Sequence, residues 1–235
     1  MRHRARAAII TAACVIVVGT TAAFAAPVIY RNLFAATPEK IPTLSVEDGA
    51  LDPETGEALD PATLSGTWTV SKGSEAGYRV NEVLNGTDVT VTGRTPNVTG
   101  TITADKLTIT DAKLTVDVAT IATDNGNRDA YFRDQAMHVS EHPTATFALS
   151  APVTAAAAPK SGEPVEQRLS GELTVAGVTR DVDLNAQMRT DGATANVVGR
   201  IPVTFEDFGV TAPSLGFVKV EPKGYIEFEL VLKRA

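Results

Sequence analysis

The sequence predicts an all-β protein whose strands form an antiparallel sheet that closes on itself or packs against a second sheet. Apolar and polar residues alternate with period two from Gly66 to Leu232, in segments rich in Thr and Val. No long helical pattern follows residue 32, so no helix is expected to cover the apolar face of the sheet. A barrel of about eight such strands has an interior that is either packed or holds one elongated ligand.

Composition restricts the classes of function. The chain has 235 residues, and its hydrophobic fraction of 43% is enough for the core of one barrel domain. The net charge of −7 argues against nucleic acid as a partner, because phosphate binding needs a basic surface. The single cysteine, Cys14, excludes an internal disulfide and a cysteine-based zinc site. No glycine-rich phosphate loop occurs, and we expect no cofactor.

Residues 1–32 have the pattern of a membrane anchor. A basic stub, Met1–Arg6, precedes Ala7–Tyr30, which carries no charge. As a helix this run would span roughly 36 Å, more than the roughly 30 Å of the hydrocarbon core of a bilayer. The basic flank predicts a single-pass protein of the cell membrane with an extracytoplasmic C-terminal domain. The alternative is a signal peptide cleaved near Ala25, which would release a secreted domain.

Residues 33–63 form the predicted linker to the barrel domain at 64–235. Acidic residues outnumber the one basic residue, Lys40, and prolines are spread through the segment. Like charges and prolines favour an extended, solvated spacer between the membrane and the barrel.

The strands follow one another along the barrel domain. In the first half of the domain, alternating apolar residues indicate three strands, which contain Trp68 and Val70, Tyr78 and Val80, and Val89 and Val91. A strand that starts at Lys106 changes phase near Asp111, which predicts a bulge. Further strands are predicted at 147–149, 169–175, 182–188, 193–205 and 226–232, with a hairpin turn at Ala176-Gly177 and an exposed loop at 151–167.

The central segment, residues 121–147, carries a sequence that matches a zinc-protease motif. His138, Glu141 and His142 have the H-x-x-E-H spacing, in which two histidines on one helix bind zinc and the glutamate activates water. Pro143 disfavours a helix at this place, and Val139 is a weak helix former. The motif is therefore predicted to be a surface loop, and no metal site is expected.

The same segment predicts a short helix over residues 125–134. Asn127 is its expected cap, and Asp129 lies in its first turn. Arg128 and Asp129 either bind a polar headgroup or tie this crossover to the barrel rim by hydrogen bonds. Tyr131 and Phe132 plug one end of the barrel or line it.

Aromatic residues elsewhere are candidates for an apolar pocket. Trp68, Phe205, Phe208 and Phe217 either line such a pocket or pack in the core. Serine, histidine and aspartate residues are present, but no nucleophile elbow or other triad motif organises them. The protein is therefore predicted not to be an enzyme.

Three segments in consistent order resemble the YceI-like family. They are Val118-Ala-Thr-Ile-Ala-Thr-Asp-Asn-Gly-Asn-Arg-Asp-Ala-Tyr-Phe132, His142-Pro-Thr-Ala-Thr-Phe147 and Ser170-Gly-Glu-Leu-Thr-Val-Ala-Gly-Val-Thr-Arg180. The resemblance covers about Gly66 to Leu232. It implies an exported lipocalin-like β-barrel whose lumen takes a polyisoprenoid or other long apolar lipid. With the N-terminal segments, the chain resembles a membrane-anchored branch of the family.

The resemblance and the pattern together give the expected binding residues: Trp68, Tyr78, Arg128, Asp129, Phe132, Phe147, Phe205, Phe208 and Phe217. Glu82 departs from the family pattern, since it shares the parity of Tyr78 and Val80 and brings an unpaired carboxylate to the inner face. The expected function is a carrier or sensor of an apolar lipid. The alternative is a non-catalytic structural or protein-interaction β-domain with a packed core.

Overall fold

The structure is a computed structural model that describes residues 37–44, 57–214 and 216–235. The predicted membrane anchor and most of the predicted linker lie outside the described residues. Within the described ranges, no helix is both long and apolar enough to cross a membrane.

The barrel is built from strands that are rich in Thr and Val. In order they are β1 (Gly66–Val70), β2 (Glu75–Leu84), β3 (Thr87–Thr95), β4 (Val98–Asp105), β5 (Thr108–Asp117), β6 (Thr144–Leu149), β7 (Val153–Thr154), β8 (Val165–Val175), β9 (Val178–Thr190), β10 (Thr194–Thr204) and β11 (Val218–Arg234). Short helical turns join them: η1 (Pro61–Leu64), η2 (Val118–Thr120), α2 (Gly126–Tyr131), η3 (Phe132–Ala136) and η4 (Phe205–Phe208).

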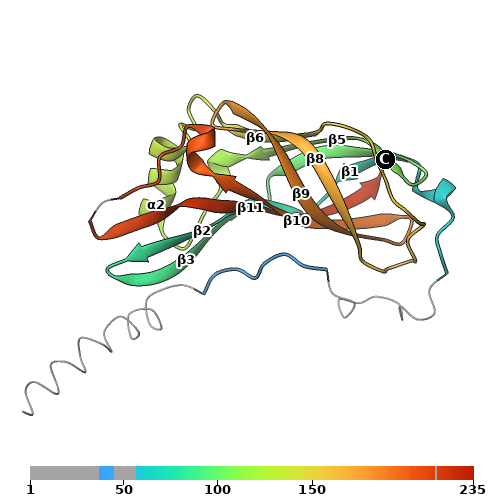
Figure 1. Ribbon diagram of the computed structural model, residues 1–235, viewed down its shortest axis with the longest axis horizontal. Coiled ribbons are helices and arrows are strands. Elements are labelled where there is room, and N and C mark those ends of the chain that lie inside the picture. Colours follow the sequence, from blue (N-terminus) through green and yellow to red (C-terminus); the bar gives the residue numbers. More distant parts are fainter. Residues whose placement is uncertain (1–36, 45–56, 215) are drawn as a thin grey trace, which may run out of the picture.

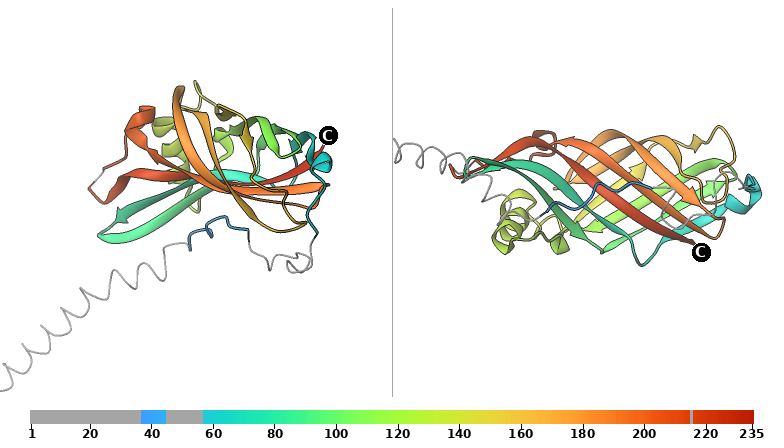
Figure 2. Two further views of the ribbon diagram at one scale, coloured as in Figure 1. Left: turned by 45° about the vertical axis from the view of Figure 1, so that its right-hand side comes forward. Right: turned by 90° about the horizontal axis from the view of Figure 1, so that it is seen from below.

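The sheet closes because β11 has partners on both sides. It pairs with β10 along one edge, and along the other with β2 and then β1. β1 and β2 follow one another in a single kinked strand, as do β3 and β4. β6 and β7 likewise pair with successive parts of β5 and count as one strand. Each of the resulting strands lies beside its neighbours in sequence. The result is a closed antiparallel barrel of eight strands, elongated along the strand direction (Figures 1 and 2). The all-β barrel prediction is confirmed.

Two local predictions are also confirmed. The register between β4 and β5 shifts between Thr103 and Ala104, opposite Asp111 and Ile109, which is the bulge expected from the change of phase. Ala176 and Gly177 both have positive φ angles, 48° and 76°, as the tight turn between β8 and β9 requires. The last strand is longer than predicted, because it begins at Val218 and not near residue 226.

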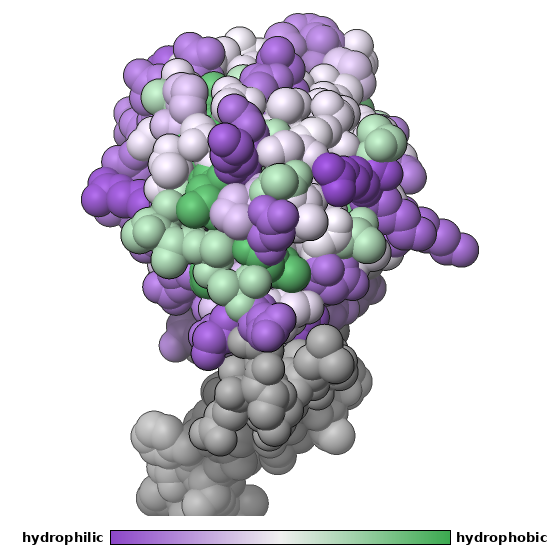
Figure 3. Space-filling model, turned by 90° about the vertical axis from the view of Figure 1, so that its right-hand side faces the viewer, coloured by the Kyte–Doolittle hydropathy of each residue, from purple (hydrophilic) through white to green (hydrophobic). Residues whose placement is uncertain are grey.

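Buried core residues fill the end of the barrel that lies far from α2, and the same cluster extends to Val118, Ile121 and Met137 of the crossover. Trp68 is 5% exposed, and its Nε1 donates to the backbone oxygen of Leu64 at 3.1 Å, so η1 closes over the indole ring. Leu184, Leu230 and Leu232 are at most 5% exposed. Seen from this end, hydrophilic residues surround a smaller group of apolar ones, and side chains fill the face (Figure 3).

The crossover between β5 and β6 carries the predicted short helix. Its cap is Asn125 and not Asn127, because the side-chain oxygen of Asn125 accepts hydrogen bonds from the backbone N–H groups of Asn127 and Arg128. The helix continues as one π-helical turn from Phe132 to Ala136. The crossover lies across the end of the barrel opposite to β1, the strand that carries Trp68 (Figure 1).

Residues 37–44 form an N-terminal strap on the outside of the barrel (Figure 2). The backbone N–H of Glu39 donates to Thr92 of β3, and its backbone oxygen accepts from Arg79 of β2 at 2.6 Å. At its far end, Leu44 donates to the side chain of Gln187 in β9. This described part of the predicted spacer is therefore hydrogen-bonded to barrel side chains through its backbone, while most of its residues remain exposed to solvent.

Candidate functional site: an apolar cavity at the helical end of the barrel

A cavity of about 500 Å³ lies inside the barrel beneath the crossover. Its size falls within the roughly 300–1,000 Å³ range of small-molecule pockets. The apolar side chains of its wall come from the crossover and from the strands and loops around it: Val80, Leu84, Val116, Val118, Ile121, Met137, Val175, Val203, Val210, Val218, Val220 and Ile226. The cavity is therefore a largely apolar chamber at one end of the barrel.

A second, smaller cavity of about 80 Å³ lies deeper in the lumen. The two share part of their walls, namely Ala76, Val116, Ala145 and Ile226. Beyond them the lumen is packed by Trp68, Leu232 and their neighbours. The barrel thus has an open half and a packed half.

Six of the predicted binding residues line the larger cavity: Tyr78, Arg128, Phe132, Phe205, Phe208 and Phe217. The rings of Tyr78 and Phe132 are stacked with their centroids 4.8 Å apart, which fixes the crossover against β2. Phe208 is buried at 5% exposure, whereas Phe217 is 61% exposed, in the loop before β11. Aromatic side chains therefore line the cavity from its wall to its mouth.

The other three predicted residues lie elsewhere. Trp68 belongs to the packed half, since its strand β1 is at the opposite end of the barrel. Phe147 lines only the smaller cavity, where its ring covers the space left by Gly171. Asp129 is buried, and its Oδ1 accepts from both the backbone N–H and the hydroxyl of Thr123, so it ties the helix to the crossover.

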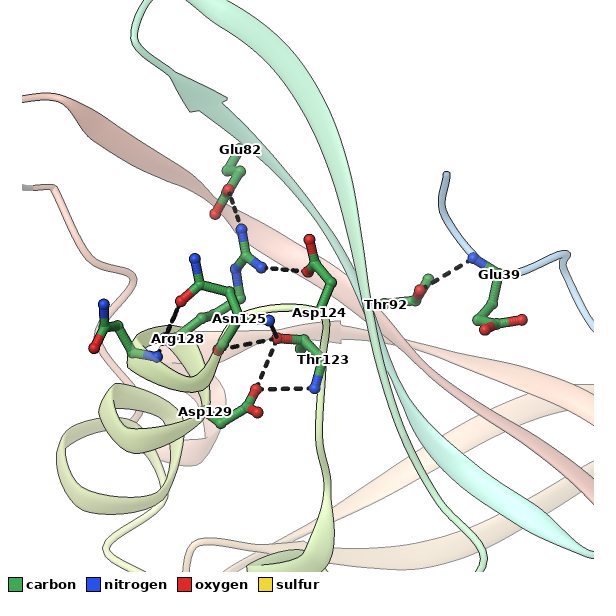
Figure 4. Close-up of polar contacts among 9 residues, drawn as sticks. Glu39, Glu82, Thr92, Thr123, Asp124, Asn125, Arg128 and Asp129 are labelled. Atoms are coloured by element: carbon green, nitrogen blue, oxygen red, sulfur yellow. Dashed lines mark hydrogen bonds and ion pairs between the residues drawn. The ribbon is translucent and has the colours of Figure 1, made fainter. Parts of the chain in front are cut away.

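A charged pair stands in the wall of the apolar cavity. Nη2 of Arg128 donates to Oε1 of Glu82 at 3.0 Å, and Nη1 donates to Oδ1 of Asp124 at 2.7 Å (Figure 4). Glu82 is only 5% exposed and lines the cavity, as its parity predicts. The expectation that its carboxylate is unpaired is wrong, because the helix brings Arg128 across to it.

Tyr78 lies beside this pair. Burial raises the pKa of the Tyr78 hydroxyl well above the usual tyrosine value, Arg128 opposes this effect, and nearby carboxylates reinforce it. The hydroxyl is therefore protonated at neutral pH and can donate a hydrogen bond.

The histidine motif does not form a metal site. Residues 138–141 form a turn in which the backbone N–H groups of Glu141 and His142 both donate to the oxygen of His138. The ring of His142 lies against Gly177 of the neighbouring hairpin. Nowhere in the described parts of the chain do three or more potential ligands gather as a metal site would require. A loop at this place agrees with the sequence prediction.

Sequence reasoning missed several residues of the cavity wall. Val218 and Val220 alternate with charged neighbours, so a period-two pattern that extends the last strand would have found them. Met137 follows the π-helical turn, and no pattern in the sequence marks its side chain as part of the wall.

Comparison with known proteins places this barrel in a family. A model of the YceI-like domain matches residues 68–232. The chain belongs to the YceI-like domain family. Its YceI-like domain includes the whole crossover and every strand of the barrel except the first two residues of β1 and the last two of β11.

Two solved structures share the fold of this YceI-like domain. A polyisoprenoid-binding domain from Saccharophagus degradans, implicated in plant cell wall breakdown, superposes with a TM-score of 0.57 at 15% identity, covering 73% of this chain and 99% of its own. Burkholderia cenocepacia BcnA gives a TM-score of 0.55 at 21% identity, with 67% and 95% coverage. At these identities the similarity shows the fold alone. No curated protein sequence matches the chain significantly.

Proposed function

We propose that this chain binds an elongated apolar lipid of the polyisoprenoid type in the cavity beneath the crossover. The observation that carries the proposal is the apolar chamber of about 500 Å³ in the open half of the barrel. The Saccharophagus degradans domain with the same fold is a polyisoprenoid-binding domain, which supports this choice of ligand.

The energetics support such a ligand. Burying about 400 Å² of apolar chain at roughly 25 cal/mol per Å² contributes about 10 kcal/mol before the costs of ordering and association. The smaller cavity adjoins the chamber at Val116 and Ala145, which line both. A ligand tail that displaces these side chains would extend toward the packed half.

The proposed role is that of a carrier or sensor without a catalytic step. The YceI-like family is a binding-domain family, which supports binding over chemistry. The cavity also favours lipid binding over the alternative of a packed structural domain, because a domain that serves only as a scaffold has no need for an apolar chamber.

We propose in addition that the domain is held on the extracytoplasmic side of the cell membrane. The basic stub and the uncharged run Ala7–Tyr30 support this location. Protease treatment of whole cells should degrade the domain while a cytoplasmic marker survives. Recovery of a chain that begins after Ala25 would instead identify the N-terminus as a cleaved signal peptide.

The binding proposal is tested on the full chain purified from its host in a mild detergent. Native mass spectrometry after release of the detergent should show one apolar ligand per chain, and solvent extraction should recover the same molecule. A chain that carries no ligand and takes up no added prenol would contradict the proposal.

A further inference from the structure

One part of the cavity lining carries charged side chains, and their charges restrict which ligands can bind. Among the described residues of its lining, Glu82 and Arg128 are the charged ones. Both belong to the wall where α2 lies against β2 (Figure 4). The polar end of a ligand in this chamber therefore has this pair as its charged neighbours, beside the uncharged Asn125 and Asn127 of the same lining.

Arg128 is not available as a simple anion receptor. Its guanidinium lies between two carboxylates, with Nη2 on Glu82 at 3.0 Å and Nη1 on Asp124 at 2.7 Å. Asp129, one residue along the helix, adds a third carboxylate that is itself buried. One cation among three carboxylates leaves the region with a negative sum of charges.

Because Glu82 and Arg128 are largely buried, the surplus of negative charge around them affects which ligands can bind. Glu82 is 5% exposed and the side chain of Arg128 is 21% exposed, so water screens them less than it screens a surface pair. A phosphate or carboxylate in the chamber would lie near Glu82 and would have to compete with two carboxylates for the same guanidinium. Like charges placed together in such a site oppose binding.

From this arrangement we infer that the cavity selects a lipid whose polar end is an uncharged hydrogen-bonding group, such as a hydroxyl or a carbonyl, and rejects lipids that end in an anion. This inference rests on the proposed function and specifies the chemistry of the ligand.

The ion pair between Arg128 and Glu82 can form hydrogen bonds with an uncharged group and remain intact. Each η nitrogen of Arg128 carries a second N–H that can donate to a carbonyl, and the carboxylate of Glu82 can accept from a hydroxyl. The protonated hydroxyl of Tyr78 lies in the same wall and provides a further donor. An uncharged end thus gains hydrogen bonds while the ion pair stays intact.

The test compares two probes that differ only at the polar end, geranylgeraniol and geranylgeranyl monophosphate. Full-length chain, stripped of lipid and held in a non-ionic detergent, is offered an equimolar mixture, and native mass spectrometry counts the two complexes. The alcohol complex should exceed the phosphate complex at least about tenfold, given the cost of placing like charges together. Equal binding, or tighter binding of the phosphate, would overturn the inference.

Three variants test whether the carboxylates of Glu82 and Asp124 cause the preference for the alcohol over the phosphate. Glu82→Gln removes the carboxylate in the wall and should reduce the ratio of alcohol to phosphate several-fold. Asp124→Asn changes the more exposed partner of Arg128, at 46% exposure, and should shift the ratio in the same direction with little risk to folding. Asp88→Asn removes the same charge from an exposed position on β3 and should leave the ratio unchanged.

The outcomes separate the two proposals. Binding of both probes with equal strength, or a ratio that responds to Asp88→Asn as much as to Glu82→Gln, contradicts the selectivity and leaves lipid binding standing. Failure of the wild-type chain to bind either probe contradicts lipid binding itself.

Discussion

Glu227 accepts a hydrogen bond from Nε of Arg79 at 2.7 Å on the outer face of the barrel, where its own side chain is completely buried. Arg94 donates to its other oxygen from the far side. In the strand register Gly77 lies between Arg94 and Glu227, so their side chains meet above a residue that has none. The N-terminal strap binds Arg79 through the backbone of Glu39 and adds cover to this cluster.

Removal of Glu227 should be strongly destabilising. Glu227→Ala removes the carboxylate that two largely buried guanidinium groups share and leaves Arg94 only its longer contact with Glu75 at 3.7 Å. Breaking a buried ion pair in this way costs about 3–5 kcal/mol. Urea unfolding followed by the fluorescence of Trp68, the single tryptophan, measures the loss. Glu172→Ala, at an exposed position on β8, should change the free energy of unfolding by no more than about 0.5 kcal/mol. Equal effects of the two substitutions would contradict this account of the cluster.

Gly77 should tolerate no side chain. A Cβ at this position would lie 1.8 Å from the backbone oxygen of Gly93, so Gly77→Ala must separate β2 from β3 and should cost about 3 kcal/mol or more. Gly126 is the matched control, because a Cβ there meets nothing within 4 Å at the start of α2. Gly126→Ala should stabilise the protein by about 0.4–1 kcal/mol. A well-folded Gly77→Ala variant would show that the strands do not approach as closely as described.

Tyr78 should make the barrel sensitive to alkali. Burial raises the pKa of Tyr78 in the folded state, so the stability that it contributes is fully present below the unfolded pKa of about 10. Above that pH the unfolded chain releases the proton while the folded chain keeps it, and the free energy of unfolding falls. Urea titrations between pH 8 and pH 11 should show this fall, and Tyr78→Phe should reduce it. Tyr225→Phe, at a tyrosine that is 37% exposed, should retain the fall. An unchanged slope in Tyr78→Phe would exclude Tyr78 as the cause.

Phe217 should contribute to ligand binding but not to folding. Its side chain is 61% exposed in the lining of the cavity, and a bound lipid would remove much of that surface from water. Phe217→Ala should weaken the binding of geranylgeraniol about tenfold, in line with the apolar area lost. Val83→Ala is the control, because Val83 is an exposed apolar residue of β2 outside the cavity lining. Equal affinities for the wild type and Phe217→Ala would place the ligand elsewhere.

The sequence allowed prediction of the barrel because its period-two pattern runs through every long strand, and strand parity also placed Glu82 on the inner face correctly. The pairing of Glu82 with Arg128 was missed, because the two residues are 46 positions apart and no local pattern links them. Trp68 was wrongly expected in the pocket. Strand parity shows whether a side chain faces inward or outward, but it does not show at which end of the barrel the side chain lies. The strap escaped prediction since its composition is that of a solvated linker, while its contacts depend on barrel side chains.

The most direct test of the central claim maps the ligand onto the chain by photo-crosslinking. Full-length chain in non-ionic detergent is irradiated with a diazirine-bearing prenol, and the labelled peptides are identified by mass spectrometry. Binding in the cavity should place labels in the crossover, residues 118–137, and in the strand and loop segments at 203–220, and excess unlabelled prenol should remove both. Labels confined to the outer face of the barrel, or labels that excess prenol does not compete away, would contradict binding in the cavity.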